Sequence, residues 1–171
     1  MPLTKFSPKN INNFVWVIRT GSKGEREGRS LAEATIMPGM GFGAATAEAP
    51  TVDSVKTSIK KFDPALPNAK VTSQANQYIR FRDEVKPGDT VVMPSKLQNG
   101  RLYIGTVTGR AYFDSVESDP EAQNKLPVDW NEEWITRDEL GQDLQNSLRS
   151  LLTIFKITRN NVANRIQQVL D

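Results

Sequence analysis

The sequence predicts an α+β fold in which a small, bent β-sheet or partial β-barrel carries helices on its outside. Strand and helix patterns alternate along the chain, and short strands interrupted by glycine outnumber long regular elements. The 171 residues suit one hydrophobic core. We therefore expect a single domain over residues 1–171, with its core in residues 14–157 and a C-terminal helix in residues 158–171.

The first half of the chain predicts two strands, a polar break and three helices. Residues 14–19, "FVWVIR", are aromatic and β-branched and predict a buried strand. A break with three glycines follows, and Ser30 with Glu33 at the third helical position favours a short helix from residue 30. "TIMPGMGFGAA" predicts a short strand that ends in an irregular loop presenting Phe42 between glycines. Apolar spacing then predicts helices over residues 51–62 and 71–85.

The second half predicts a hairpin and a closing strand and helix. "KPGD" at residues 86–89 indicates a sharp turn, which Asp89 closes, and the strand "TVVMPS" follows it. Asn99-Gly100 predicts a tight hairpin turn into a partner strand over residues 101–113. A strand over residues 126–135 and a helix from Thr136, with a Thr136–Glu139 capping box, come next. The segment "LLTIFKI" predicts the last strand.

Composition excludes several kinds of site. The chain has no histidine and no cysteine, which rules out disulfides, zinc sites of the Cys or His type, and Ser-His-Asp or Cys-His triads. With 22 Lys and Arg against 20 Asp and Glu, the formal charge is only +2, so nucleic-acid binding requires a clustered basic face. No apolar run is long enough to span a bilayer and no signal peptide is visible. We expect a cytoplasmic protein with no metal, no cofactor and no membrane contact.

The order of motifs resembles a known group of domains. The segments are "FVWVIRTG", the glycine-rich "GMGFG", "NQYIRFRDEVKPGDTVVMPSK", "LYIGTVTGRAYFD" before "LPVDW", and "LRSLLTIFKI". Together they resemble the N-terminal domain of many Mrr-type and other modification-dependent restriction endonucleases. That domain is similar to EVE domains, which belong to the PUA-like group. The resemblance covers about residues 14–157, and its most specific part pairs "FRDEVKPGDTVVMPS" with "YIGTVTG".

The resemblance implies a PUA-like or EVE-like bent sheet whose pocket accepts a modified base, commonly a modified cytosine, flipped out of DNA. Such a reader needs aromatic walls for the extruded base and polar groups for its edge. We assign five residues to the modified-base pocket: Trp16, Thr20, Phe42, Tyr78 and Ser95. Core positions are the alternative for Trp16 in its strand and for Tyr78 on its helix.

Holding the distorted phosphate backbone requires cations and N–H donors. Residues 19–29, "RTGSKGEREGR", here called the lip, combine such groups with glycines that allow close backbone approach. The residues that we assign to the nucleic-acid backbone come from the lip and the later hairpin: Arg19, Ser22, Lys23, Arg26, Lys96, Arg101 and Arg110. The alternative is a solvated loop whose charges partly cancel against Glu25 and Glu27.

These assignments predict a non-catalytic module that recognises a modified base in DNA and targets a fused or associated restriction nuclease. "GSKGEREGRS" lacks the P-loop spacing, and Glu84 with Lys86 lies at a helix end rather than on a nuclease strand. A small-molecule or modified-RNA sensor on the same fold is the alternative, and a carboxylate enzyme is a third. A continuous basic strip beside the pocket favours DNA, whereas an isolated pocket favours a small ligand. The oligomeric state stays open.

Overall fold

The computed structural model describes residues 13–158 and 161–171, and within them the fold is α+β, as predicted. The described strands form one mixed sheet in the order β2-β6-β4-β3-β1-β8, with β5 pairing with β6 and β7 with β4. Only the β1–β3 pair is parallel among these described pairs. The strands are β1 Val15–Ile18, β2 Thr35–Ile36, β3 Thr90–Pro94, β4 Arg101–Val107, β5 Tyr112–Phe113, β6 Asn124–Trp130, β7 Ile135–Thr136 and β8 Ile154–Ile157.

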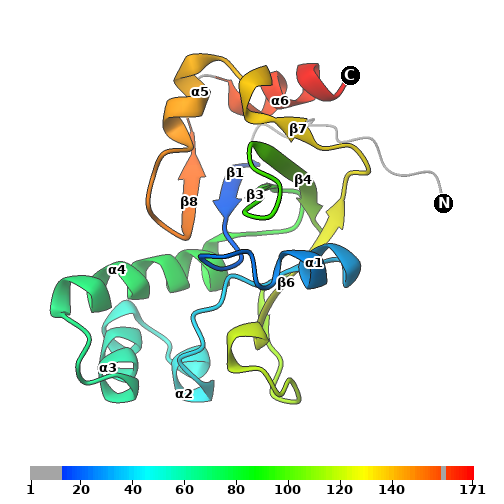
Figure 1. Ribbon diagram of the computed structural model, residues 1–171. Helices are drawn as coiled ribbons and strands as arrows, with labels where there is room; N and C mark the ends of the chain where they lie inside the picture. The colour runs from blue at the N-terminus through cyan, green and yellow to red at the C-terminus, as the bar shows by residue number, and fades with distance from the viewer. Residues whose placement is uncertain (1–12, 159–160) are drawn as a thin grey trace.

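Helices cover both faces of the sheet (Figure 1). The α-helices are α1 Glu27–Ala32, α2 Ala44–Glu48, α3 Val52–Phe62, α4 Asn68–Ile79, α5 Gln142–Ser147 and α6 Val162–Leu170. A π-helical turn, η1 Arg80–Glu84, extends α4, and 3₁₀ turns occupy η2 Pro120–Ala122 and η3 Arg137–Glu139. Within the described residues, no helix has the combination of length and apolar composition that crossing a membrane requires.

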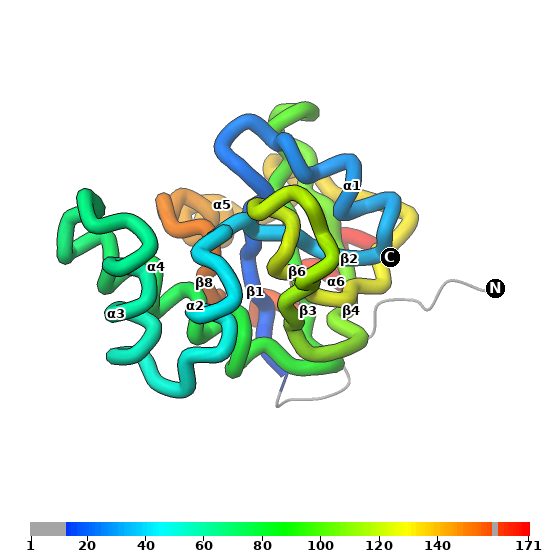
Figure 2. Tube along the Cα trace, turned by 90° about the horizontal axis from the view of Figure 1, so that it is seen from below, coloured from blue at the N-terminus to red at the C-terminus, as the bar shows by residue number. Residues whose placement is uncertain are grey.

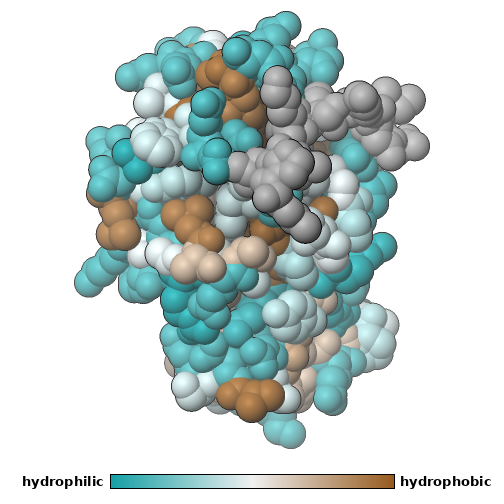
Figure 3. All heavy atoms as spheres, turned by 90° about the vertical axis from the view of Figure 1, so that its right-hand side faces the viewer, coloured by the Kyte–Doolittle hydropathy of each residue, from teal (hydrophilic) through white to brown (hydrophobic). Residues whose placement is uncertain are grey.

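The sheet separates two hydrophobic cores, because side chains of a strand alternate between its faces. In β1, Trp16 and Ile18 face the core shared with α3 and α4, whereas Val15 and Val17 face the core shared with α5 and α6. This double coverage explains why β1 is apolar at every position. Figure 3 shows the outer face on one side of the molecule, where hydrophilic side chains dominate and apolar ones form small separate patches.

Several predicted helices differ from the observed ones. The helix predicted from Ser30 begins at Glu27, since the Ser30 hydroxyl is buried and accepts from the Met37 N–H instead of capping. The helix predicted over 51–62 is confirmed as α3, with Thr51 and Ser54 as its capping box. The second begins at Asn68 rather than residue 71 and ends in η1. The segment after Phe42, predicted as loop, continues into the short helix α2.

The C-terminal half also breaks where a continuous element was expected. The partner strand over 101–113 divides into β4 and β5, and the strand over 126–135 into β6 and β7. The Thr136–Glu139 capping box is confirmed, but it starts a 3₁₀ turn, and α5 follows as a separate helix after Gly141. Gly100 has φ of 83°, as its turn requires, although the connection between β3 and β4 spans residues 95–100. The terminal helix is α6, and residues 1–12 and 159–160 lie outside the described residues.

Candidate functional site

Trp16 does not form an open wall. Its side chain is 1% exposed, and its indole Nε1 donates to Asp89 Oδ2 at 3.0 Å. Asp89 is fully buried and also accepts from the backbone N–H groups of Phe14 at 3.0 Å and Lys86 at 3.1 Å. The aspartate therefore closes the "KPGD" turn, as predicted, and also ties it to β1. With its ring enclosed and its N–H already bonded, Trp16 occupies a core position, which was the alternative to the pocket assignment.

Thr20 and Ser95 are likewise buried, and Ser95 belongs to a junction that the sequence did not predict. The Ser95 hydroxyl donates to Glu27 Oε1 at 2.5 Å, and the Lys96 N–H donates to Glu27 Oε2 at 3.0 Å. Glu27 is only 2% exposed. In the sequence this glutamate counted as a solvated charge of the lip. In the structure its carboxyl group anchors the lip to the β3–β4 connection.

Two of the arginines that were predicted to contact the nucleic-acid backbone point inward. The Arg19 guanidinium donates to the carbonyl oxygens of Leu148, at 3.0 Å, and of Leu152, and it lies over the Phe155 ring at 5.4 Å. Burial, with a smaller effect from the positive charge of Arg137, lowers the pKa of Arg19 from its usual value. Arg26 Nε donates to the Met37 carbonyl at 3.0 Å. Both arginines therefore hold the lip in place.

The other lip and hairpin residues form an exposed rim where β1 and β3 end and β4 begins. Ser22, Lys23 and Lys96 are exposed. A Cβ at Gly24 would lie 3.1 Å from the Lys96 Cβ, so the lip and the hairpin touch. Arg101 lies over the exposed Trp134 ring at 3.8 Å. The structure thus groups these predicted residues on one rim, and their contact with nucleic acid stays a prediction.

A small cavity lies elsewhere, between η1, α2 and β5, and we call it the Tyr78 cavity. Its volume is about 100 Å³. Of the predicted pocket residues, Tyr78 alone lines it. Its lining, most of which sequence reasoning missed, consists of Ala47, Tyr78, Phe81, Arg82, Ala111, Tyr112, Phe113 and Asn124. The adjacent aromatic residues Tyr112 and Phe113 were a usable signal for this cavity in the sequence, because a short edge strand leaves such rings partly exposed.

The polar groups of the Tyr78 cavity mostly have partners. The Tyr78 hydroxyl donates to Asn124 Oδ1 at 3.0 Å, and burial raises the pKa of Tyr78 to about 12. Both hydrogens of Asn124 Nδ2 are used by the carbonyls of Gly39 at 3.1 Å and Met40 at 2.9 Å. Arg82 donates to Asp83 and to carbonyls at the end of α2. An amide oxygen can accept two hydrogen bonds, and within the described residues Tyr78 is the one donor to Asn124 Oδ1.

The "GMGFG" segment borders this cavity without lining it. Gly39 and Met40 have φ of 91° and 55°, and the Asn124 amide holds both of their carbonyls. A Cβ at Gly41 would lie 2.7 Å from the Pro120 carbonyl oxygen, so the close approach there requires glycine. Phe42 is half-buried and packs edge-on against Phe62, with ring centroids 5.9 Å apart. Phe42 therefore packs against Phe62 and does not line the Tyr78 cavity, where a wall for the base would lie.

Arg110, which was predicted to contact the nucleic-acid backbone, lies near this cavity. Its guanidinium donates to the Asp83 carbonyl at 2.9 Å, next to Arg82 of the lining, and it precedes Ala111 in the chain. No lip residue lines the cavity. Seen from below, the lip and α1 lie at the top of the view, whereas α3 and α4 form its left side (Figure 2). The structure therefore separates the two groups of residues that the sequence placed around one pocket.

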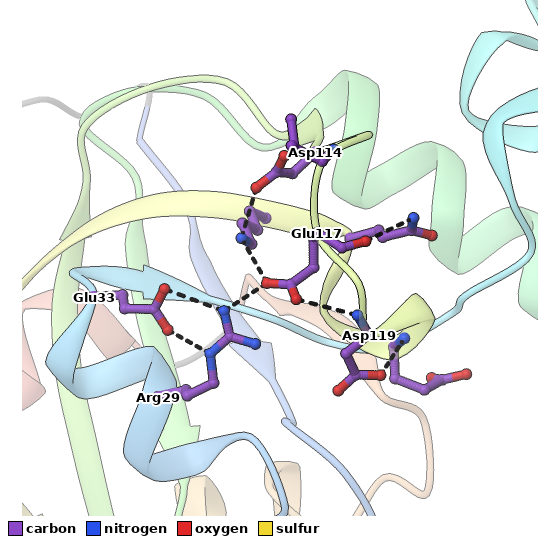
Figure 4. A network of polar contacts seen from close by, with 9 residues as sticks. Arg29, Glu33, Asp114, Glu117 and Asp119 are labelled. Atoms are coloured by element: carbon purple, nitrogen blue, oxygen red, sulfur yellow. Dashed lines mark hydrogen bonds and ion pairs between the residues drawn. The ribbon is translucent and has the colours of Figure 1, made fainter.

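A charge network beside α1 has a structural role (Figure 4). Arg29 pairs with Glu33 and Glu117, each at 2.5 Å, and Lys125 pairs with Asp114 at 2.8 Å and Glu117 at 3.1 Å. The hydrogen bond from Arg29, followed by a backbone N–H and Lys125, lowers the pKa of Glu117 to about 2. The network joins α1 to β6 and to the loop before η2. Across residues 13–158 and 161–171, no cluster of three or more carboxylates is placed to hold a metal ion.

Comparison with known proteins places the chain in a family without assigning it a function. No curated protein matches the chain. The sequence profile of the family described as "Domain of unknown function (DUF8426)" matches residues 16–158, which run from the second residue of β1 to the end of β8 and include the lip and the Tyr78 cavity but not α6. Since this match covers most of the chain, the protein belongs to the DUF8426 family.

Proposed function

We propose that this domain is a non-catalytic reader that binds DNA and accommodates a modified base, in the first place a modified cytosine, in the Tyr78 cavity. The observation that carries the proposal is the cavity itself. It is about 100 Å³ in volume, is walled by aromatic rings and offers one available acceptor position on Asn124 Oδ1. The resemblance of the motif order to PUA-like domains of modification-dependent nucleases supports the same role and suggests a linked or associated nuclease as the partner.

The chemistry of the lining favours a pyrimidine with an exocyclic amino group. Cytosine carries an N4 amino donor, which the oxygen of Asn124 can accept. The donors of Asn124 are already engaged, so a base edge that presents only acceptors gains nothing there. The apolar side chains of Ala47, Phe81 and Ala111 provide contacts for an added methyl group. The small volume favours one ring over two.

The energies are compatible with base flipping. Unstacking and unpairing a base cost a few kcal/mol, and stacking on an aromatic side chain contributes about 1–3 kcal/mol per base. Tyr112 is 47% exposed and Phe113 is half-buried, and as neighbours on β5 they face opposite sides of the strand, so one of the two rings can stack on the base at the cavity mouth. Stacking on that ring offsets much of the cost of flipping, and the hydrogen bond to Asn124 then discriminates between bases.

A small-molecule or modified-RNA sensor is the second candidate, and one observation favours it. The exposed lysines Lys23, from the lip, and Lys96, from the β3–β4 connection, belong to a rim that contributes nothing to the cavity lining. Arg110, whose guanidinium is bonded to the Asp83 carbonyl, is the predicted cation near the mouth. A cavity that lies apart from the lysines of the rim suits a free nucleoside or a similar planar ligand.

The test is a binding panel with matched variants. Duplexes that carry cytosine, methylcytosine, hydroxymethylcytosine or methyladenine, and the free modified nucleosides, are titrated at two salt concentrations. We expect one modified duplex to bind tightest and Tyr112→Ala to lower the preference for it several-fold. Trp134→Ala is the control, since this ring is also 47% exposed but lies on the rim.

The outcomes separate the candidates. Equal and steeply salt-dependent binding of all duplexes contradicts the reader and leaves a general backbone binder. Salt-independent binding of a free nucleoside, with weaker binding of every duplex, favours the sensor. If Tyr112→Ala and Trp134→Ala change the base preference equally, the Tyr78 cavity is not where the base is read.

A further inference from the structure

A second concave surface lies between α3 and α4, which run side by side in both views (Figure 1; Figure 2). The groove has a volume of about 420 Å³. One wall comes from α3 and the other from the first turns of α4, and its lining is Lys56, Thr57, Lys60, Lys61, Asn68, Val71 and Thr72. These side chains bring three ammonium groups, two hydroxyls and an amide to one surface, and none of the lining residues is acidic.

The helical period explains why the lysines gather there. Val55 and Ile59 are fully buried and direct one face of α3 into the core. Lys56 directly follows Val55, and Lys60 directly follows Ile59. Because the two lysines are four residues apart, they lie on the same flank of the helix. Lys60 Nζ donates to the Leu66 carbonyl at 2.7 Å, which fixes its charge at the groove. The sequence pattern alone gives these lysines only the solvated side of an amphipathic helix.

Two of the three charges have no protein partner. Among the residues that the structure describes, neither Lys56 nor Lys61 makes a side-chain hydrogen bond or ion pair. Like charges held together in a concavity repel one another and attract anions, and an open groove favours an extended anion over a compact one. A phosphodiester backbone has the matching charge and shape.

We propose that the α3–α4 groove binds the phosphate backbone of the DNA whose base enters the Tyr78 cavity. The inference rests on the proposed function, because α4 connects the two sites. Val71 lines the groove and Tyr78 lines the cavity, seven residues apart on this helix. At 1.5 Å per residue, the separation along the helix axis is about 10 Å. That distance corresponds to about three nucleotides of one strand at 3.4 Å each, so the groove contacts backbone that flanks the flipped base.

The test uses the double variant Lys56→Gln/Lys61→Gln, which removes the two unpaired charges and leaves the Lys60 contact. The control is Arg149→Gln/Lys156→Gln, which removes two exposed charges on the α5–β8 side of the molecule. Binding of a fluorescent methylcytosine duplex is measured by anisotropy over a range of salt concentrations. Each phosphate contact contributes about 0.9 to the slope of log K against log salt. We therefore expect the slope to become shallower by about 1.8 for the groove variant and to stay unchanged for the control.

Each outcome bears on the proposal separately from the reader function. If the groove variant keeps the wild-type slope, or if the control loses as much, the groove is not a backbone site, whatever base is preferred. If the wild type binds all duplexes alike while the groove variant alone loses slope, the reader function fails and the groove stands. Absence of any duplex binding by the wild type overturns both. Thermal unfolding of the variants shows whether a lost slope reflects a lost fold.

Discussion

The bond between the lip and the hairpin offers a quantitative check on the structure. Glu27→Gln keeps the shape of the side chain but replaces one carboxyl oxygen by an NH₂ group. In the wild type both oxygens accept, from the Ser95 hydroxyl at 2.5 Å and the Lys96 N–H at 3.0 Å. The glutamine oxygen can keep the bond from the Lys96 N–H. The NH₂ group then faces the Ser95 hydroxyl, which accepts from it by turning its proton away, so two bonds persist without the charge in a site that is 2% exposed.

The expected loss of stability follows from the two hydrogen bonds that Glu27 accepts. A hydrogen bond to a charged group contributes about 1.5–3 kcal/mol and one between neutral groups about 0.5–1.5 kcal/mol, so converting both bonds should lower the free energy of unfolding by about 2 kcal/mol. Glu25→Gln is the matched control two residues earlier. Glu25 is exposed and accepts from the Lys23 N–H at 3.4 Å, so its replacement should leave the free energy of unfolding nearly unchanged.

Urea unfolding of the three proteins measures the difference, and hydrogen exchange at the Lys96 amide locates it. We expect this amide to exchange faster in Glu27→Gln and at the wild-type rate in Glu25→Gln. A Glu27→Gln protein with wild-type stability would refute the reasoning. Equal losses in both variants would do so too, since they would point to net charge rather than to the buried junction.

Three further predictions concern the turn, the cavity and the rim. Asp89→Ala leaves one buried and two partly buried donors without an acceptor, and we expect a loss of about 3–5 kcal/mol, counting roughly 1–3 kcal/mol for the buried donor and about 1 kcal/mol for each partly buried one. Denaturant unfolding followed by tryptophan fluorescence checks this, and an unchanged midpoint would contradict it. Because burial raises the pKa of Tyr78 from 10.0 to about 12, its contribution to stability should be complete below pH 10 and be lost as the pH rises to about 12. Tyr78→Phe should abolish this alkaline loss in unfolding measured at each pH. If Lys23 and Lys96 contact the DNA backbone, Lys23→Gln/Lys96→Gln should make the salt slope shallower by about 1.8, at 0.9 per phosphate; an unchanged slope would leave the rim outside the interface.

The sequence predicted those elements whose signals are local. Buried β1, helix α3 with its Thr51 cap, the "KPGD" turn and the Thr136–Glu139 box all follow from residues within one or two turns of each other. Their physics involves neighbouring backbone groups, so the pattern alone is sufficient. The α+β class follows from the same signals, because strands and helices that each bury one side must pack on one another.

The candidate site was less predictable, since it depends on pairs far apart in the chain. Ser30 has the chemistry of a helix cap, but Met37 supplies a donor that holds its hydroxyl elsewhere. Trp16 has the chemistry of a base wall, but Asp89, 73 residues away, takes its N–H into the core. Of the five pocket residues, the structure keeps Tyr78 at a cavity, and its partner Asn124 had no local signal at all.

The sequence by itself determined which chemistry is available to this protein: no histidine or cysteine, a nearly balanced charge, and aromatic, glycine-rich and basic segments in a fixed order. The tertiary structure alone decided which of these groups remain free to act. It buried Glu27 at a junction, turned Arg19 and Arg26 inward, and left Lys56 and Lys61 unpaired in a groove. The physical reason is that burial and pairing are properties of contacts between distant segments, which no local pattern encodes.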